Sequence, residues 1–153
     1  MNDHVNIVEV SPRDGLQNEA QFIATEDKLA LIERLLACGL RTIEATAFVS
    51  PKWVPQMRDA AELYPLLPKH RACRFPVLVP NIQGYELARA CGVTDIAVFT
   101  AASEAFNQKN INASIDESIE RFQPILARAR ADGVRVRGYI STVRKNGVHV
   151  MHA

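Results

Sequence analysis

The stretch VNIVEVSPRDGLQNE, from Val5 to Glu19, decides how the rest of the chain is interpreted. Its first residues, 5–10, form a short apolar run that predicts a β-strand, which the following Ser-Pro pair ends. Arg13 and Asp14 come next and would lie just past the carboxyl end of this strand, where β/α proteins bind ligands. A carboxylate there can bind a divalent cation, and a guanidinium can bind a carboxylate or enolate oxygen. The same two residues could also form a surface ion pair in a turn.

Strands and helices alternate after this stretch. The expected strands cover residues 5–10, 41–48, 74–80, 95–100 and 134–141. The expected helices cover residues 25–39, 56–63, 83–91 and 114–133. Thr25 is expected to cap the first helix, Ser114 and Glu117 have the spacing of a capping box, and residues 102–112 are expected to form a polar loop. The sequence therefore predicts an α/β fold with about five parallel strands and four intervening helices.

Two ways of closing such a sheet fit this order of elements: an open, doubly wound sheet or part of a (β/α)8 TIM barrel. The phosphate-binding patterns GxGxxG and GxxxxGK[ST] are both absent from the sequence, which weakens the nucleotide-binding version of the open sheet. Polar residues recur just beyond the ends of the expected strands, as they do on the active face of a barrel. We therefore expect a partial TIM barrel.

Composition excludes several classes of protein. The chain has 153 residues, with 18 basic and 17 acidic side chains, so a net charge of +1 gives no reason to expect a nucleic acid or membrane partner. Hydrophobic residues make up 48% of the chain, which is typical of a globular domain. The three cysteines are odd in number and form no CxxC pair, which favours the reducing cytoplasm.

Five strings of residues resemble the hydroxymethylglutaryl-CoA lyase family, which belongs to a wider group of metal-dependent lyases and Claisen-type synthases. They are VEVSPRDGLQNE at 8–19, FVSPKWVPQM at 48–57, PVLVPN at 76–81, AASEAFNQKNIN at 101–112 and VRVRGYIS at 134–141. The Arg-Asp-Gly element is common to the whole group and does not select a reaction. The second and fourth strings are long and uncommon, and they favour the lyase. The resemblance covers residues 5–142.

The resemblance implies roles for the residues around the first loop. Asp14 would bind a divalent cation, Mg²⁺ or Mn²⁺. Arg13 would face the substrate carbonyl or the product enolate, and Gln17 would help to orient the site. Glu44, on the second expected strand, would lie near the metal-bound hydroxyl and tune its proton transfer, or would pair with an arginine for stability alone.

Two further residues would contact the substrate. Asn81 would donate hydrogen bonds within the site, or would only cap the following helix. Lys109 lies in a segment where a CoA phosphate could bind, although a solvated loop charge explains it as well.

The implied reaction is a retro-Claisen cleavage of 3-hydroxy-3-methylglutaryl-CoA to acetyl-CoA and acetoacetate, a step of leucine degradation and ketone-body metabolism. The expected partner is a small acyl-CoA molecule, with no nucleic acid and no membrane, and a homo-oligomer is left open. Two alternatives remain: a related Claisen-type synthase or aldolase that shares Arg-Asp-Gly, and a non-catalytic half-barrel that binds a partner chain.

The resemblance also predicts what this chain lacks. A barrel needs eight strands, whereas residues 1–142 are interpreted as the N-terminal part of one and residues 143–153 as a non-matching tail. The family's His-x-His metal ligands and its glycine-rich loop with a reactive cysteine match no position. We therefore expect a truncated lyase with little or no activity of its own.

Overall fold

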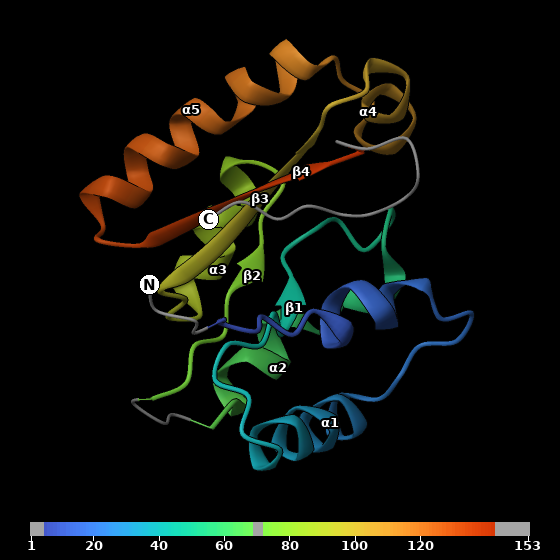
Figure 1. Cartoon of the computed structure of the whole chain (residues 1–153), viewed down its shortest axis with the longest axis vertical. Helices are drawn as coiled ribbons and strands as arrows, with labels where there is room; N and C mark the ends of the chain where they lie inside the picture. The colour runs from blue at the N-terminus through green and yellow to red at the C-terminus, as the bar shows by residue number, and fades with distance from the viewer. Residues whose placement is uncertain (1–4, 69–71, 143–153) are drawn as a thin grey trace.

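A computed structural model describes residues 5–68 and 72–142. Its centre is a parallel sheet of four strands that lie in the order of the chain (Figure 1). The strands are β1 (Thr46–Ala47), β2 (Val77–Leu78), β3 (Asp95–Ala101) and β4 (Arg135–Ser141). The longest pairing joins β3 to β4 over seven residues, from Asp95↔Arg135 to Ala101↔Ser141.

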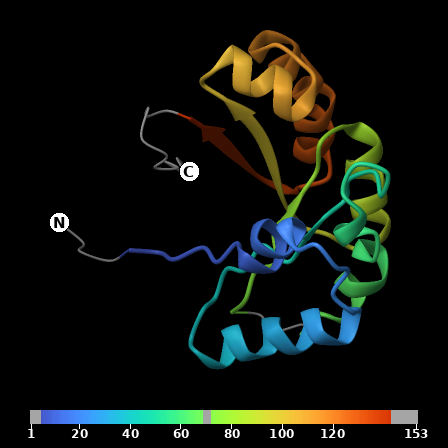
Figure 2. The ribbon, with the colours of Figure 1, turned by 90° about the vertical axis from the view of Figure 1, so that its right-hand side faces the viewer.

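Helices connect the strands and cover the sheet. They are α1 (Thr25–Ala37), α2 (Ala60–Leu66), α3 (Ile82–Ala90), α4 (Glu104–Ile111) and α5 (Ile115–Ala131). Three single turns complete the elements: η1 (Ser11–Gly15), η2 (Leu16–Asn18) and η3 (Pro55–Met57). In Figure 2 the helices α1, α2, α3 and α5 lie on one side of the sheet and leave the other side to the N-terminal segment. Sequential parallel strands with helices on one side are the arrangement of a barrel segment, whereas a doubly wound sheet carries helices on both faces. The expected partial barrel is confirmed.

The expected first strand, 5–10, is wrong as a full strand. Only Glu9 pairs, through a parallel bridge to Ile43 with backbone hydrogen bonds Glu9 N to Thr42 O (2.9 Å) and Glu44 N to Glu9 O (2.7 Å). Val5 and Ile7 are 83% and 65% exposed, so no burial holds them in the sheet. The single bridge still matters, because it fixes the chain entering η1 beside Glu44.

Helix α4 lies where a polar loop was expected. The side chain of Ser103 caps it by accepting a hydrogen bond from Phe106 N (3.4 Å). Asn107 is the buried residue of this helix, so α4 has no apolar stripe, the pattern on which a sequence-based helix assignment depends. The expected capping box of α5 is confirmed, with reciprocal hydrogen bonds between Ser114 and Glu117.

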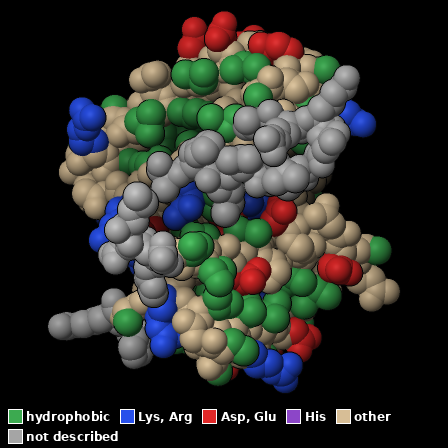
Figure 3. Space-filling view, in the orientation of Figure 1, with side chains coloured by type: hydrophobic (Ala, Val, Ile, Leu, Met, Phe, Trp, Pro, Cys, Tyr) green, Lys and Arg blue, Asp and Glu red, His purple; other side chains and the backbone are tan. Residues whose placement is uncertain are grey.

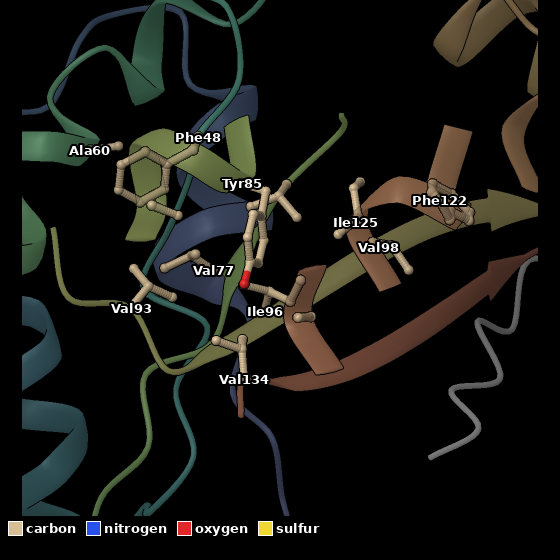
Figure 4. Close-up of a cluster of buried hydrophobic side chains, with 13 residues drawn as sticks. Phe48, Ala60, Val77, Tyr85, Val93, Ile96, Val98, Phe122, Ile125 and Val134 are labelled. Atoms are coloured by element: carbon tan, nitrogen blue, oxygen red, sulfur yellow. The ribbon is translucent and has the colours of Figure 1, made fainter. Parts of the chain in front are cut away.

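Two clusters of buried side chains fix the helices to the sheet. The larger one lies between β2 and β3 on one side and α3 and α5 on the other (Figure 4). It contains Phe48, Val77, Tyr85, Ile96, Val98, Phe122, Ile125 and Val134, among others. The smaller cluster joins α1 and α2 to the segment around Ile43 and Ala45. Each large apolar side chain buried in this way contributes about 1.5–3 kcal/mol, so both clusters hold the strand ends at fixed positions.

A buried ion pair fixes α1 to the segment before α2. Lys28 Nζ lies 2.6 Å from Asp59 Oδ1 and donates to Gln56 O (2.5 Å), and the two charged side chains are 1% and 4% exposed. Thr25 Oγ1 donates to Asp59 Oδ2 (3.0 Å). The expected cap is wrong, because Thr25 is the first residue of α1 and Ala24 takes the cap position. The hydroxyl stabilises the ion pair instead of the helix end.

Candidate active site

The turn η1 places the first two candidate residues. It begins after Val10, whose carbonyl accepts hydrogen bonds from Arg13 N (3.1 Å) and Asp14 N (2.7 Å). Pro12 stands near the start of the turn, where the missing N–H is not needed. The side chain of Arg13 is 11% exposed and that of Asp14 is 52% exposed. The turn thus buries the guanidinium and leaves the neighbouring carboxylate in contact with solvent.

Arg13 lies between two carboxylates. Its Nε donates to Glu44 Oε1 (2.5 Å), and its Nη1 donates to Asp14 Oδ1 (2.6 Å). Its Nη2 makes no hydrogen bond within residues 5–68 and 72–142. A guanidinium carries donors in a rigid planar fork, so the open nitrogen is a fixed donor that a ligand oxygen could use.

Glu44 is fully buried and has a second partner. Its side chain is 0% exposed, and Tyr139 Oη donates to Glu44 Oε2 (2.5 Å). Burial, together with the charge and the hydrogen bond of Glu44, raises the pKa of Tyr139 well above its ordinary value. Tyr139 is therefore a neutral donor throughout the physiological pH range. The site residues Arg13, Glu44 and Tyr139 come from three segments that are far apart in the sequence.

Tyr139 is the residue that sequence reasoning missed. The polar positions predicted from the sequence lie just beyond strand ends, whereas Tyr139 lies inside β4. In register it pairs with Phe99, while Ile96 and Val98 of β3 pack against the helices. Successive side chains of a strand point to opposite faces, so Phe99 and Tyr139 share the face away from the helices. The alternation of β4 could have indicated this, but no sequence pattern connects Tyr139 with Glu44.

The other predicted site residues are more loosely placed. Gln17 lies in η2, directly after the Arg-Asp-Gly turn, while its neighbour Asn18 donates to Asp14 O (2.7 Å). Asn81 caps α3 by accepting from Gly84 N (2.9 Å), as one of its two expected roles required. Lys109 is exposed in the last turn of α4. The part that each of these residues plays toward a substrate stays a prediction.

A divalent cation would need more than the described residues supply. In the described part of the chain no group of three or more His, Cys, Asp or Glu side chains could hold a metal ion. Asp14 is the solvent-accessible carboxylate of the site, and one of its oxygens already accepts from Arg13. A single carboxylate does not hold such an ion against water. The metal role of Asp14 therefore stays a prediction that requires additional ligands.

The face of the sheet away from the helices carries the side chains of Phe99 and Tyr139. Figure 3 shows this face, with apolar and basic side chains exposed on it and acidic side chains gathered at the top of the view. Among residues 5–68 and 72–142, no helix has both the length and the hydropathy needed to cross a bilayer. The proposed tail, 143–153, lies outside the described residues, and the domain boundary at 142 stays a prediction.

Comparisons with known proteins identify relatives of the chain. The mitochondrial hydroxymethylglutaryl-CoA lyase of Bos taurus is 55% identical over 139 residues, which are 91% of this chain and 43% of that protein. The crystal structure of hydroxymethylglutaryl-CoA lyase from Pseudomonas aeruginosa matches with a TM-score of 0.88 and 51% identity, over 95% of this chain and 50% of that one.

A third relative was solved with ligands. It is an HMG-CoA lyase from Acinetobacter baumannii in complex with coenzyme A and 3-methylmalate, with a TM-score of 0.86 and 30% identity, over 95% of this chain and 48% of that one. The chain thus spans about half the length of the relatives it matches. The family described as HMGL-like matches residues 4–149. The chain therefore belongs to the HMGL-like family of carbon–carbon lyases, the hydroxymethylglutaryl-CoA lyases, and forms part of their TIM barrel.

Proposed function

We propose that this chain supplies the Arg13 part of an active site for the metal-dependent retro-Claisen cleavage of 3-hydroxy-3-methylglutaryl-CoA to acetyl-CoA and acetoacetate. The observation that carries the proposal is the open Nη2 of a guanidinium whose other two nitrogens are already held by Glu44 and Asp14. A solved relative was crystallised with coenzyme A, which supports an acyl-CoA as the small-molecule partner. The three free cysteines fit a reducing compartment such as the cytoplasm.

The chemistry follows from where charge develops. When the tertiary hydroxyl of the substrate loses its proton, its oxygen forms a carbonyl and the adjacent carbon–carbon bond breaks. The electron pair of that bond moves to the thioester fragment, which leaves as the enolate of acetyl-CoA and then takes up a proton. A donor fixed in a buried position stabilises such an enolate oxygen without reorganising. In this proposal the open nitrogen of Arg13 acts in this way, and the hydrogen bond to Glu44 restricts the movement of the guanidinium.

The divalent cation would supply acidification of the substrate hydroxyl, and Asp14 is the proposed ligand. Because the described residues provide no complete metal site, we expect the 153-residue chain alone to have little or no lyase activity.

The exposed apolar residues Val136 and Ile140 of β4, at 37% and 42% exposure, favour the alternative that the β4 edge of the sheet binds another chain. Sedimentation of the purified chain at several concentrations would distinguish a monomer from a homo-oligomer.

Arg13→Lys tests the role of the open nitrogen. Lysine keeps the buried positive charge but lacks the planar fork. Loss of one charge-assisted hydrogen bond should weaken the binding of 3-hydroxy-3-methylglutaryl-CoA, measured by calorimetry, by about tenfold or more. Arg121→Lys is the matched control, since Arg121 is exposed on α5 and donates to the backbone carbonyls of Ile111 and Asn112.

Acetoacetate release, followed with added Mg²⁺ or Mn²⁺, tests the activity of the chain itself. Release near background is expected, and turnover comparable to that of a full-length lyase would contradict the prediction of low activity. Equal affinity of wild type and Arg13→Lys for the acyl-CoA would overturn the proposed role of Arg13. Preference for acetyl-CoA and a 2-oxo acid as joint substrates would favour the synthase alternative.

A further inference from the structure

We propose that Tyr139 is a positioning residue that prevents Glu44 from binding Arg13 through both carboxylate oxygens, and so keeps Arg13 Nη2 free for a substrate oxygen. This inference rests on the proposed function of Arg13. It adds a residue from the last strand of the described chain to a site that otherwise consists of the first loop and the segment before β1.

The shape of the guanidinium decides how it can pair with a carboxylate. Its Nε–H and one Nη2–H point in the same direction, and this edge fits the two oxygens of a carboxylate in a bidentate pair. Glu44 faces this edge but uses only one of its oxygens, since Oε1 accepts from Arg13 Nε (2.5 Å). Asp14 takes Nη1 on the other side of the group. The single-bonded arrangement therefore leaves open the one donor that a bidentate pair would occupy.

The hydrogen bond to the second carboxylate oxygen of Glu44 explains why Glu44 does not form a bidentate pair with Arg13. Oε2 accepts from Tyr139 Oη (2.5 Å), in a contact that spans 95 residues of sequence. Glu44 is 0% exposed, so water does not replace this donor. Without the hydroxyl, Oε2 would be a buried acceptor with no partner, which is unfavourable. Turning the carboxylate toward Nη2 would satisfy that oxygen and occupy the Nη2–H that lies beside Nε–H.

Tyr139 is itself held in place. It is 6% exposed, and its strand β4 pairs in register with β3 both before and after the Phe99↔Tyr139 position along the strand. The ring therefore reaches Glu44 from a rigid element and has little freedom to leave. Phenylalanine would fill the same space without the hydroxyl, so Tyr139→Phe changes the hydrogen bond alone.

The chain offers a matched control in Tyr85. Its hydroxyl also donates to a carboxylate, Asp132 Oδ2 (2.7 Å), but between α3 and α5 and away from Arg13. Tyr85→Phe and Tyr139→Phe remove the same kind of bond from two places. An effect of Tyr139→Phe that reflects only a loss of stability will appear in both variants, and circular dichroism will show whether each one folds.

The experiment is NMR of the Arg13 side chain in the ¹⁵N-labelled, purified chain. In wild type, rotation about the Cζ–Nη2 bond of Arg13 should be fast, because Nη2 has no hydrogen-bond partner in the part of the chain that the structure describes. In Tyr139→Phe the bidentate pair should slow this rotation by about tenfold or more, and in Tyr85→Phe it should stay as in wild type. Slow rotation already in wild type, or unchanged rotation in Tyr139→Phe, would overturn the proposal.

Calorimetry with 3-hydroxy-3-methylglutaryl-CoA separates this proposal from the proposed function. If Tyr139→Phe slows the rotation and also weakens acyl-CoA binding by about tenfold, both are supported. If the rotation slows but wild type does not bind the acyl-CoA, the positioning role of Tyr139 stands and the proposed function of Arg13 fails.

Discussion

Replacing Asp59 with asparagine leaves the buried ammonium of Lys28 without its counter-charge, which predicts a large loss of stability. Asp59 Oδ1 bonds Lys28 and Oδ2 bonds Thr25, so the change weakens two contacts at once. Breaking a buried pair by neutralising one partner costs about 3–5 kcal/mol. Lys28 keeps the Gln56 carbonyl and the face of the Phe22 ring, 4.5 Å from Nζ. We therefore expect about 3 kcal/mol, the lower end of that range.

Urea unfolding followed by circular dichroism measures this loss. With a slope of about 2 kcal/mol/M, a loss of about 3 kcal/mol lowers the midpoint by about 1.5 M. Asp116→Asn is the control, because Asp116 is exposed in the first turn of α5 and should change stability by less than about 0.5 kcal/mol. A loss below about 1 kcal/mol for Asp59→Asn would show that the Lys28 charge is not confined as the structure describes.

Two further predictions concern α3. Burial and the Asp132 hydrogen bond raise the pKa of Tyr85 from 10.0 to about 12. The Tyr85 hydroxyl therefore stabilises the fold fully below pH 10, and this contribution is lost as the pH rises through 12. Tyr85→Phe should remove that part of the alkaline loss of stability in pH-dependent unfolding, and an unchanged alkaline profile would contradict the assignment. Gly84→Ala should destabilise the fold by about 1–3 kcal/mol, since a Cβ at Gly84 would lie 2.5 Å from Phe48 O, and a melting temperature equal to that of wild type would show that the backbone can move apart there.

Much of the fold could be predicted from local patterns. The alternation of apolar runs and amphipathic segments predicted the order of β1 to β4 and of the helices α1, α2, α3 and α5, because each pattern depends on a few neighbouring residues. The capping box at Ser114 and Glu117 was identified for the same reason. Helix α4 was missed because only Asn107 is buried in it, and polar helices held by caps carry no periodic signal.

The candidate site was predictable in part. Arg13 and Glu44 were expected from the family resemblance, and the structure brings them into contact. Tyr139 was not expected, because its contact with Glu44 joins residues 95 apart and no spacing in the sequence indicates it. The strand 5–10 was overestimated because an apolar run reports a tendency to pair, whereas pairing also needs a partner strand within reach.

The strand order has a consequence for how the chain folds during synthesis. Each strand of the sheet lies beside the one made just before it, so every new strand and helix can add to finished neighbours as it leaves the ribosome. The hydrogen bond from Tyr139 to Glu44 is the exception, since 95 residues separate its ends. During synthesis the carboxylate of Glu44 therefore lacks its Tyr139 donor until β4 has been made and has joined the sheet.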